Sequence, residues 1–207
     1  FSGHLFDQVE AEVPQFARRC IGDAQDSREP QTLAGIVSDL RIVNGQRGKA
    51  AIFKFDDKTA AIESVVAEEL LNAHLAQLKD DELLILTGKV QNDRFSGGLR
   101  FNVQQITDLA TARSQRARHL LVPVTDTLPA FDALLAEHPA RPAPPSEFGE
   151  DTRPQGVNVR LRIQRETASG DVDLGDAVRF FPSDAALAWW KAQTRGAARM
   201  VYSDESA

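Results

Sequence analysis

The sequence is poor in cysteine, in positive charge and in long apolar runs. Cys20 is the only cysteine among the 207 residues, so an intrachain disulfide cannot form, and zinc sites built from several cysteines are excluded. No apolar run approaches the roughly 20 residues that a bilayer-spanning helix needs. We therefore expect a cytoplasmic protein with no membrane partner. The chain starts with Phe1 instead of methionine, which predicts that it is a piece of a longer protein.

Charge is distributed unevenly along the chain. The formal net charge is −6 and the isoelectric point is about 5.3, which argues against a protein that coats nucleic acid or membranes with its whole surface. Residues 89–118, however, hold six lysines or arginines against two acids, and residues 67–82 hold five acids against one lysine. The sequence thus predicts one basic region and one acidic region, and phosphates would be drawn to the basic one.

Motifs of the common catalytic sites are missing as well. The four histidines have no partner at metal-ligand spacing, and there is no Gly-x-Ser-x-Gly elbow, P-loop or dinucleotide fingerprint. Asp56–Asp57 and the acids at 80–82 offer the oxygen ligands that divalent cations prefer, but acids at strand and helix ends more commonly form turns. We predict no catalytic residue, no metal and no cofactor within this chain.

The first half of the chain shows strand and helix periodicity in an informative order. Three runs rich in β-branched and aromatic residues are followed by a helical face of leucines, and then by two more strand-like runs. The expected strands are 33–43, 50–56, 60–66, 83–90 and 99–106, and the expected helix is 67–78. Five strands with a helix between the third and the fourth are the plan of an OB-fold, a partly open barrel. An SH3-like barrel would not place a full helix there.

The remaining segments predict a second, smaller unit, so the fold class is α+β. We expect a helical lead-in at 1–30, an OB-fold domain at 31–110 and a C-terminal α+β domain at 119–207. The finer expectations are a helix at 3–20 bent near Pro14, a short basic helix or linker at 108–118, a helix at 126–138 and an exposed loop at 139–155. They continue with a strand at 157–163, a strand or a pair of strands around Gly175 at 172–181, a helix N-capped by Ser183 and a last strand in ARMVYSD. The loop holds five of the ten prolines, which is typical of an extended linker.

Two glycine-rich hairpins fall where an OB-fold binds its ligand. Oligonucleotides lie across the second and third strands and are held by the loops that join strands one to two and four to five. Those loops read NGQRGK and QNDRFSGG here, and each presents an arginine. The nucleic-acid-binding candidates are Arg41, Gln46, Arg47, Lys49, Lys54, Arg94, Phe95 and Arg100. Arginines on hairpin tips can also serve only to keep sheet edges soluble, and Phe95 either stacks on a base or folds back onto the barrel rim. Because basic residues occur in both of the loops where this fold holds its ligand, we favour nucleic-acid binding.

Two adjacent tryptophans characterise the last predicted helix. A helix buries one face, so Trp189 and Trp190 cannot both lie fully inside it. One alternative is a binding surface for another protein, to which nearby aromatic residues would contribute. The other alternative is lateral packing against the strands of a small domain. The partner-binding candidates are Phe180, Phe181, Trp189, Trp190 and Tyr202.

Several stretches of the chain resemble one known family. LAGIVSDLRIVNGQRGKAAIFKFDD, IESVV, LLILTGKV and DRFSGGLRFNVQQITDLATAR closely resemble the OB-fold region of bacterial DNA polymerase III alpha subunits, the replicative C-family polymerases. FSGHLFDQ is similar to the segment after the family's helix-hairpin-helix domain. RLRIQRETASGDVDLGDAVRFFPSDAAL is similar to the family's C-terminal domain, so the resemblance spans nearly the whole chain and is strongest in the barrel.

The resemblance implies a role in DNA replication within the DNA polymerase III holoenzyme. The parent protein would be a DNA-directed DNA polymerase, a nucleotidyltransferase that uses magnesium and deoxynucleoside triphosphates, and this chain would be its noncatalytic C-terminal fragment. The barrel would contact single-stranded template DNA, with Arg41, Arg47 and Lys49 at basic positions of the family's first loop. The last domain would bind the tau subunit of the clamp loader. A clamp-binding segment is not evident in RMVYSDESA, so the sliding clamp stays an open partner.

Three alternatives remain at the level of the sequence. The chain could be a protein-interaction module whose barrel never meets DNA. It could be the anticodon-binding OB domain of an aminoacyl-tRNA synthetase, although nothing in it resembles a synthetase catalytic domain. It could also belong to the error-prone paralogue of the same polymerase, but the C-terminal domain is a better match to the replicative form.

Overall fold

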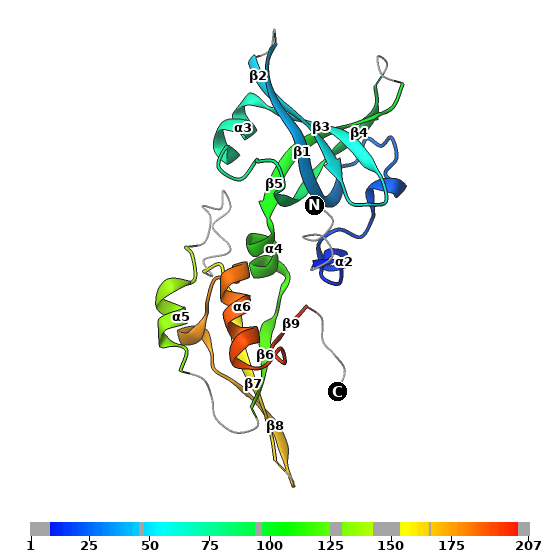
Figure 1. Ribbon diagram of the computed structural model, residues 1–207. Coiled ribbons are helices and arrows are strands. Elements are labelled where there is room, and N and C mark those ends of the chain that lie inside the picture. Colours follow the sequence, from blue (N-terminus) through cyan, green and yellow to red (C-terminus); the bar gives the residue numbers. More distant parts are fainter. Residues whose placement is uncertain are drawn as a thin grey trace. The chain divides into compact units, whose positions relative to one another are not determined.

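The computed structural model describes residues 9–45, 48–93, 97–124, 130–142, 154–165 and 167–202 of the chain. The chain divides into two compact units, Phe1–Leu109 and Ala110–Ala207, which we call the barrel unit and the sheet unit. Each unit has its own cluster of buried apolar side chains. Figure 1 labels the helices and strands of both.

Five strands of the barrel unit close into a barrel in the order β1-β2-β3-β5-β4. The strands are β1 (Gln31–Gly45), β2 (Gly48–Asp56), β3 (Ala61–Ala67), β4 (Leu83–Asn92) and β5 (Leu99–Asp108). Neighbouring strands are antiparallel except for β3 and β5, which run parallel. Helix α3 (Glu68–His74) lies between β3 and β4 in the chain, so the predicted OB-fold is confirmed.

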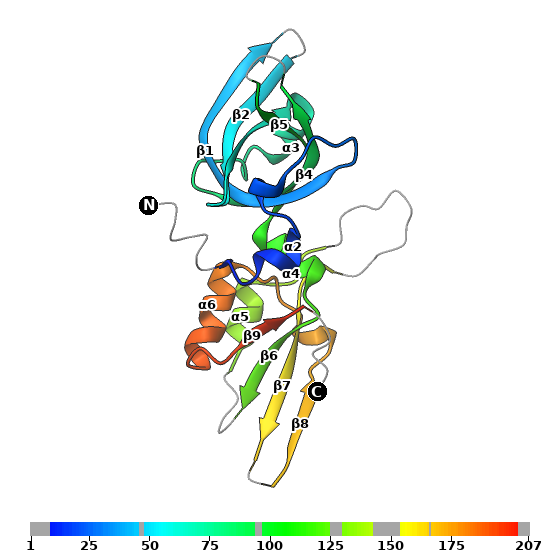
Figure 2. The same ribbon diagram turned by 90° about the vertical axis from the view of Figure 1, so that its right-hand side faces the viewer.

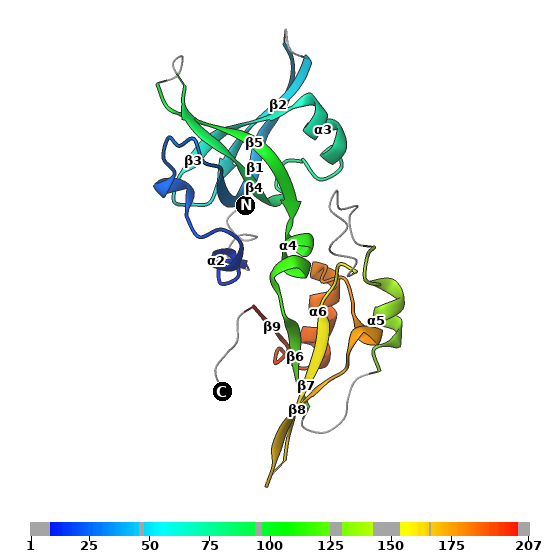
Figure 3. The same ribbon diagram turned by 180° about the vertical axis from the view of Figure 1, so that it is seen from behind.

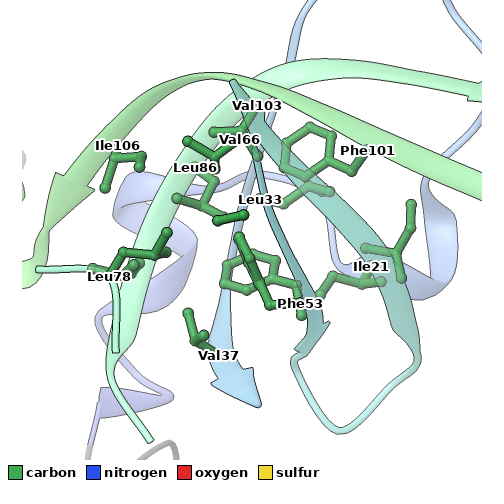
Figure 4. Packing of buried hydrophobic residues seen from close by; sticks show 14 of the residues in the cluster. Ile21, Leu33, Val37, Phe53, Val66, Leu78, Leu86, Phe101, Val103 and Ile106 are labelled. Carbon is green, nitrogen blue, oxygen red and sulfur yellow. The ribbon is translucent and has the colours of Figure 1, made fainter. Parts of the chain in front are cut away.

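Side chains that alternate along β2 and β3 help to fill the barrel. In β2, Phe53 and Phe55 point inward and are buried, whereas Lys54 between them is exposed. The rings of the two phenylalanines meet edge-on, with 6.2 Å between their centroids. Figure 4 shows Phe53 of β2, Val66 of β3 and Phe101 of β5 converging inside the barrel. Because each inward residue removes apolar surface from water, this core fixes which face of every strand points outward.

Helix α3 is shorter than the predicted helix 67–78. It ends at His74, whose carbonyl oxygen accepts the N–H groups of Gln77 and Leu78, each at 3.0 Å, in a closing turn. His74 Nδ1 lies 2.6 Å from Gln77 Oε1, and the Gln77 side chain donates to Asp108 at 3.0 Å. Leu71 and Leu78 are buried in the barrel core, but Leu75 of the predicted apolar face is 54% exposed. The predicted face is therefore confirmed only in part, and the helix stops one turn early.

Asp57 joins the turn between β2 and β3 to the segment that precedes β1. Its side chain is buried, and one carboxylate oxygen accepts the N–H of Ile21 at 2.6 Å. The other oxygen accepts the N–H and hydroxyl of Thr59, at 2.9 and 2.6 Å, and the N–H of Ala60 at 3.2 Å. The short 3-10 helix η1 (Ile21–Asp23) is thereby held against the barrel core, and the carboxylate has the turn role expected from its position.

The lead-in contains a much shorter helix than the predicted 3–20. Helix α2 spans Val13–Phe16 with Pro14 in its first turn, where the missing N–H of proline has no partner to lose. Ala17 is already extended. Residues 3–8 of the predicted helix lie outside the described residues.

Four strands form the sheet of the second unit in the order β8-β7-β6-β9. They are β6 (His119–Val124), β7 (Asn158–Gln164), β8 (Ser169–Asp173) and β9 (Arg199–Val201). The central β6 and β7 are parallel, and both outer pairs are antiparallel. The other elements are α4 (Leu109–Arg116), α5 (Asp132–Glu137), η2 (Asp176–Val178) and α6 (Asp184–Gln193). Figure 2 shows α5 and α6 behind the sheet, which leaves the other face toward the viewer.

Trp190 lies at the centre of the core of the sheet unit. Its side chain is fully buried, with ring centroids 5.7 Å from Phe131 and 6.2 Å from Phe180. Trp189 meets it edge-on at 5.1 Å. At the start of α6, the hydroxyl of Ser183 accepts the N–H of Ala186 at 3.2 Å, so the predicted N-cap is confirmed.

Three other predicted segments differ from the structure of the sheet unit. The predicted strand 172–181 is shifted, because β8 ends at Asp173 and Gly175, with a φ of +74°, turns the chain into η2. The predicted helix 126–138 is reduced to α5, and residues 125–129 lie outside the described residues. The two ends of the loop 139–155 are joined, since Arg141 and Gln155 form an isolated antiparallel bridge. Residues 143–153 are not described.

Candidate nucleic-acid interface

The outside of the barrel presents two rows of side chains that cross all five strands. Cross-strand register aligns the first row as Ser38, Lys54, Glu63, Arg100 and Gln91, and the second as Arg41, Ile52, Val65, Asn102 and Lys89. These residues alternate with the buried side chains of the core, so they point outward. We call this surface the outer wall. The β1–β2 and β4–β5 hairpins project from the same end of the barrel, as Figures 1 and 3 show.

Positive charge exceeds negative charge on the outer wall. The cations of the two rows are Arg41, Lys54, Lys89 and Arg100, and their carboxylate is Glu63, which gives these described residues a net charge of +3. Asp93 follows β4 and pairs with Arg100 at 3.1 Å, which lowers the sum to +2. The outer wall is therefore a local basic surface on a chain whose total charge is −6, and such a surface attracts phosphate.

Glu63 is placed between two arginines of the outer wall. Its Oε1 accepts hydrogen bonds from Nε and Nη2 of Arg100 at 3.1 and 2.7 Å. Its Oε2 lies 3.6 Å from Nη2 of Arg41. Because Arg41 is on β1 and Glu63 is on β3, the guanidinium of Arg41 reaches across β2. The exposed fractions are 66% for Arg41, 40% for Glu63 and 36% for Arg100, so solvent reaches all three side chains.

The geometry of the β1–β2 hairpin accounts for its glycines. Gly45 pairs with Gly48 on either side of residues 46–47, and Gly48 has a φ of +97°, which other residues rarely adopt. A Cβ atom at position 48 would collide with the carboxylate of Glu68. Lys49 follows in register with Asn44 and is exposed. The first turn of the acidic helix α3 thus lies against the basic hairpin, so acidic and basic regions are less separate than predicted.

The structure describes four of the eight residues that are predicted to contact nucleic acid. Arg41, Lys54 and Arg100 come together on the outer wall, and Lys49 lies beside it on the hairpin. The four candidates Gln46, Arg47, Arg94 and Phe95 lie outside the described residues, so their contacts stay predictions.

The basic residues of segment 89–118 are divided between the two units of the chain. Lys89 and Arg100 belong to the outer wall, but Arg113 is in α4 of the sheet unit and is buried. Its Nη1 donates to Asp184 Oδ1 at 2.5 Å and to the carbonyl oxygen of Pro182 at 3.5 Å. Arg113 therefore fastens α4 to the start of α6 and adds no charge to the outer wall.

Three of the five aromatic partner-binding candidates are core residues. Phe180 and Trp190 have no exposed surface, and Phe181 is 4% exposed. Buried rings cannot form a binding surface in this conformation, so the lateral-packing alternative accounts for them. Trp189 and Tyr202 keep part of their surface exposed, and a partner contact by these two stays a prediction.

Two outer-wall residues were missed by reasoning from the sequence. Lys89 lies in a run, 83–90, that reads as almost wholly apolar, and only its alternation with buried Val90 identifies its outward position. Glu63 acquires its partners through the parallel pairing of β3 with β5, which joins residues 37 positions apart. Period-two alternation could have found Lys89, whereas no local signal could have found the partners of Glu63.

The face of the sheet opposite α5 and α6 carries charges in matched pairs. Arg160 of β7 lies 3.4 Å from Asp173 of β8, and Arg162 lies 3.0 Å from Asp171. The hydrogen bond from Arg162 lowers the pKa of Asp171. His119 of β6 is buried, and this burial, followed by the nearby charge of Arg160, lowers its pKa below 6.5, against the opposing effects of Asp173 and Asp171.

Among the residues that the structure describes, no helix is both long and apolar enough to cross a membrane. In the same residues, no three His, Cys, Asp or Glu side chains gather in a metal-binding arrangement.

Similar proteins point to one family. A model of the tRNA anti-codon group, described as an OB-fold nucleic acid binding domain, matches residues 31–109. DNA polymerase III subunit alpha of Pseudomonas aeruginosa is 35% identical over 120 residues, which cover 58% of this chain and 10% of that protein. The Vibrio cholerae subunit is 28% identical over 189 residues, which cover 90% of this chain and 16% of that protein.

Among solved structures, the second OB-fold domain of replication protein A from Methanococcus maripaludis is similar to part of this chain. It is 17% identical and covers 43% of this chain and 91% of its own, with a TM-score of 0.35, too low to add to the comparison. The chain spans only about a tenth to a sixth of the length of its polymerase relatives. The predicted resemblance is confirmed: the barrel is an OB-fold domain homologous to that of DNA polymerase III alpha subunits.

Proposed function

We propose that this chain is the noncatalytic C-terminal part of a replicative DNA polymerase III alpha subunit, and that its barrel contacts single-stranded template DNA. The observation that carries the proposal is the net positive outer wall formed by Arg41, Lys54, Lys89 and Arg100 on an OB-fold. The parent protein would be a DNA-directed DNA polymerase of the cytoplasm. Its magnesium and its deoxynucleoside triphosphates would bind outside this chain.

The composition of the outer wall favours contacts to phosphates over contacts to bases. Among the described residues of its two rows none is aromatic, and Ile52 and Val65 supply a small aliphatic surface between the cations. Stacking of bases on aromatic rings is the usual source of tight single-strand binding, whereas phosphate contacts are independent of sequence and sensitive to salt. Binding of this kind suits a template strand that must move along the protein.

Salt titration of oligonucleotide binding tests the proposed role of the barrel. The 207-residue chain should bind a fluorescent oligothymidylate at low salt, and the logarithm of its affinity should fall linearly with that of the salt concentration. Arg41→Ala and Lys54→Ala should each reduce the magnitude of the slope by about 0.7, because each removes one phosphate contact to a single strand. Arg47→Ala with Lys49→Ala should act in the same direction.

Two outcomes would contradict this assignment. Slopes that remain unchanged in these variants would remove the outer wall from the DNA site. A preference for a tRNA anticodon stem-loop over single-stranded DNA would favour the alternative that the barrel is the anticodon-binding domain of an aminoacyl-tRNA synthetase.

We propose in addition that the sheet unit binds the tau subunit of the clamp loader. The support is the resemblance of its sequence to the last domain of the family, together with the partly exposed Trp189 and Tyr202. Partly exposed aromatic residues are frequent centres of protein interfaces. Trp189→Ala should weaken the binding of purified tau by about tenfold or more if this residue is such a centre, and Lys191→Ala, on the same helix, is the control. Unchanged affinity would exclude this surface.

A further inference from the structure

Glu63 lies where a phosphate group would have to lie on the outer wall. Its two carboxylate oxygens face Arg100 and Arg41, and phosphate offers arginine a similar pair of acceptors. We propose that Glu63 is an intramolecular substitute for phosphate: it holds Arg41 and Arg100 in place on the free protein, and a backbone phosphate of the bound strand displaces it. This inference rests on the proposed binding of DNA by the barrel.

The arrangement of the strands supports this role. Arg41 on β1, Glu63 on β3 and Arg100 on β5 belong to the consecutive strands β1-β2-β3-β5 of the barrel wall. Both guanidinium groups approach the same carboxylate, and two cations that share one place repel each other unless an anion lies between them. Glu63 supplies that anion when no strand is bound. The carboxylate thus keeps both guanidinium groups over β2 and β3, the strands that an OB-fold presents to its ligand.

The exposure of the three side chains makes an exchange of anions easy. They are 36–66% exposed, and ion pairs at such exposure contribute little to stability because water competes for both partners. A phosphate can therefore replace the carboxylate without unfolding any element of the barrel. After the exchange, the charge of Glu63 remains close to the phosphate and weakens its binding, which allows the strand to leave.

Removal of the charge at position 63 tests the inference. Glu63→Gln keeps the shape of the side chain but removes the carboxylate that Arg41 and Arg100 share, and Arg100 keeps its ion pair with Asp93. The affinity for oligothymidylate at low salt should therefore rise by about three- to tenfold. The salt slope should become steeper by up to about 0.7. Glu137→Gln is the matched control, since Glu137 is exposed on α5 of the sheet unit and makes the same change in net charge. The control should change the affinity less than the Glu63 variant does.

A second background separates displacement from simple repulsion. Glu63→Gln should give no gain in a chain that also carries Arg41→Ala and Arg100→Ala. In that chain neither guanidinium group is left for the carboxylate to pair with. A gain that persists would show that Glu63 only repels the strand, and it would overturn the inference. Equal affinities of wild type and Glu63→Gln would also overturn it, while leaving the proposed DNA binding intact. If neither protein bound at low salt, the proposed function itself would fail.

Discussion

The outer wall of the barrel and the face of the sheet opposite α5 and α6 both carry arginines, but the arginines are paired differently. On the sheet, Arg160 and Arg162 each face an aspartate of β8 in direct register, so the charges cancel. On the barrel, two arginines share Glu63, and Lys54 and Lys89 add further charge. Cross-strand register, and not the number of arginines, therefore decides which face attracts phosphate.

The largest expected effect tests whether the two units keep separate cores. Trp190→Ala removes the central ring of the sheet unit and should lower its free energy of unfolding by about 3–5 kcal/mol. Urea denaturation measures this loss. Oligonucleotide binding by the barrel should be unchanged, because the barrel has its own core. Trp189→Ala, at a partly exposed position, is the control and should cost less. A parallel loss of DNA binding would mean that the two faces cannot be compared as independent surfaces.

The corresponding change in the barrel concerns Asp57. Asp57→Ala leaves the N–H groups of Ile21, Thr59 and Ala60 without their acceptor, and should destabilise the barrel by about 2–3 kcal/mol, since hydrogen bonds to charged groups are the stronger ones. Asp56→Ala, which loses one exposed bond to the N–H of Lys58, is the matched control. Equal effects of both variants in thermal unfolding would contradict the role given to the buried carboxylate.

Removal of carboxylates from the sheet unit should give it a basic face like that of the barrel. Asp171→Asn with Asp173→Asn removes the two β8 carboxylates that pair with Arg160 and Arg162 and gives this face of the sheet a surplus of positive charge. This variant should gain affinity for oligothymidylate at low salt by about two- to fivefold, an effect that screening abolishes at high salt. Asp132→Asn with Glu137→Gln changes the net charge equally at exposed positions of α5 and serves as the control. Equal gains in both variants would mean that net charge alone matters.

The smallest expected effect is a dependence of stability on pH that belongs to the sheet unit. The pKa of His119 is lowered by burial, so the unfolded chain takes up a proton near pH 6.5 that the folded unit does not. The free energy of unfolding should therefore fall as the pH drops below about 6.5, and the lowered pKa of Asp171 adds a loss in the same direction at more acidic pH. His119→Gln should flatten the profile between pH 7 and 5 in urea titrations, and an unchanged profile would contradict this cause.

Much of the fold follows from the sequence because alternation and turn signals are local. Phe53, Lys54 and Phe55 reveal the two faces of β2 without any knowledge of its neighbours, and Ser183 marks the start of α6. The failures occur where distant contacts decide. For Phe180 and Trp190 the sequence leaves partner binding and core packing open, because nothing local shows that α6 packs on the sheet. The partners of Glu63 depend on a strand pair far apart in the chain.

The closure of the barrel has a consequence for the order in which its parts form during folding. β1 pairs with β4 across large distances in the chain, and the hydroxyl groups of Thr32 and Thr87, 55 positions apart, lie within 2.9 Å of each other. Contacts of such separation form slowly, whereas the β1–β2–β3 meander can form early. Arg100 reaches Glu63 only after β5 has joined β3. A growing chain therefore presents no complete outer wall until its last barrel strand has been made, and then presents all of it at once.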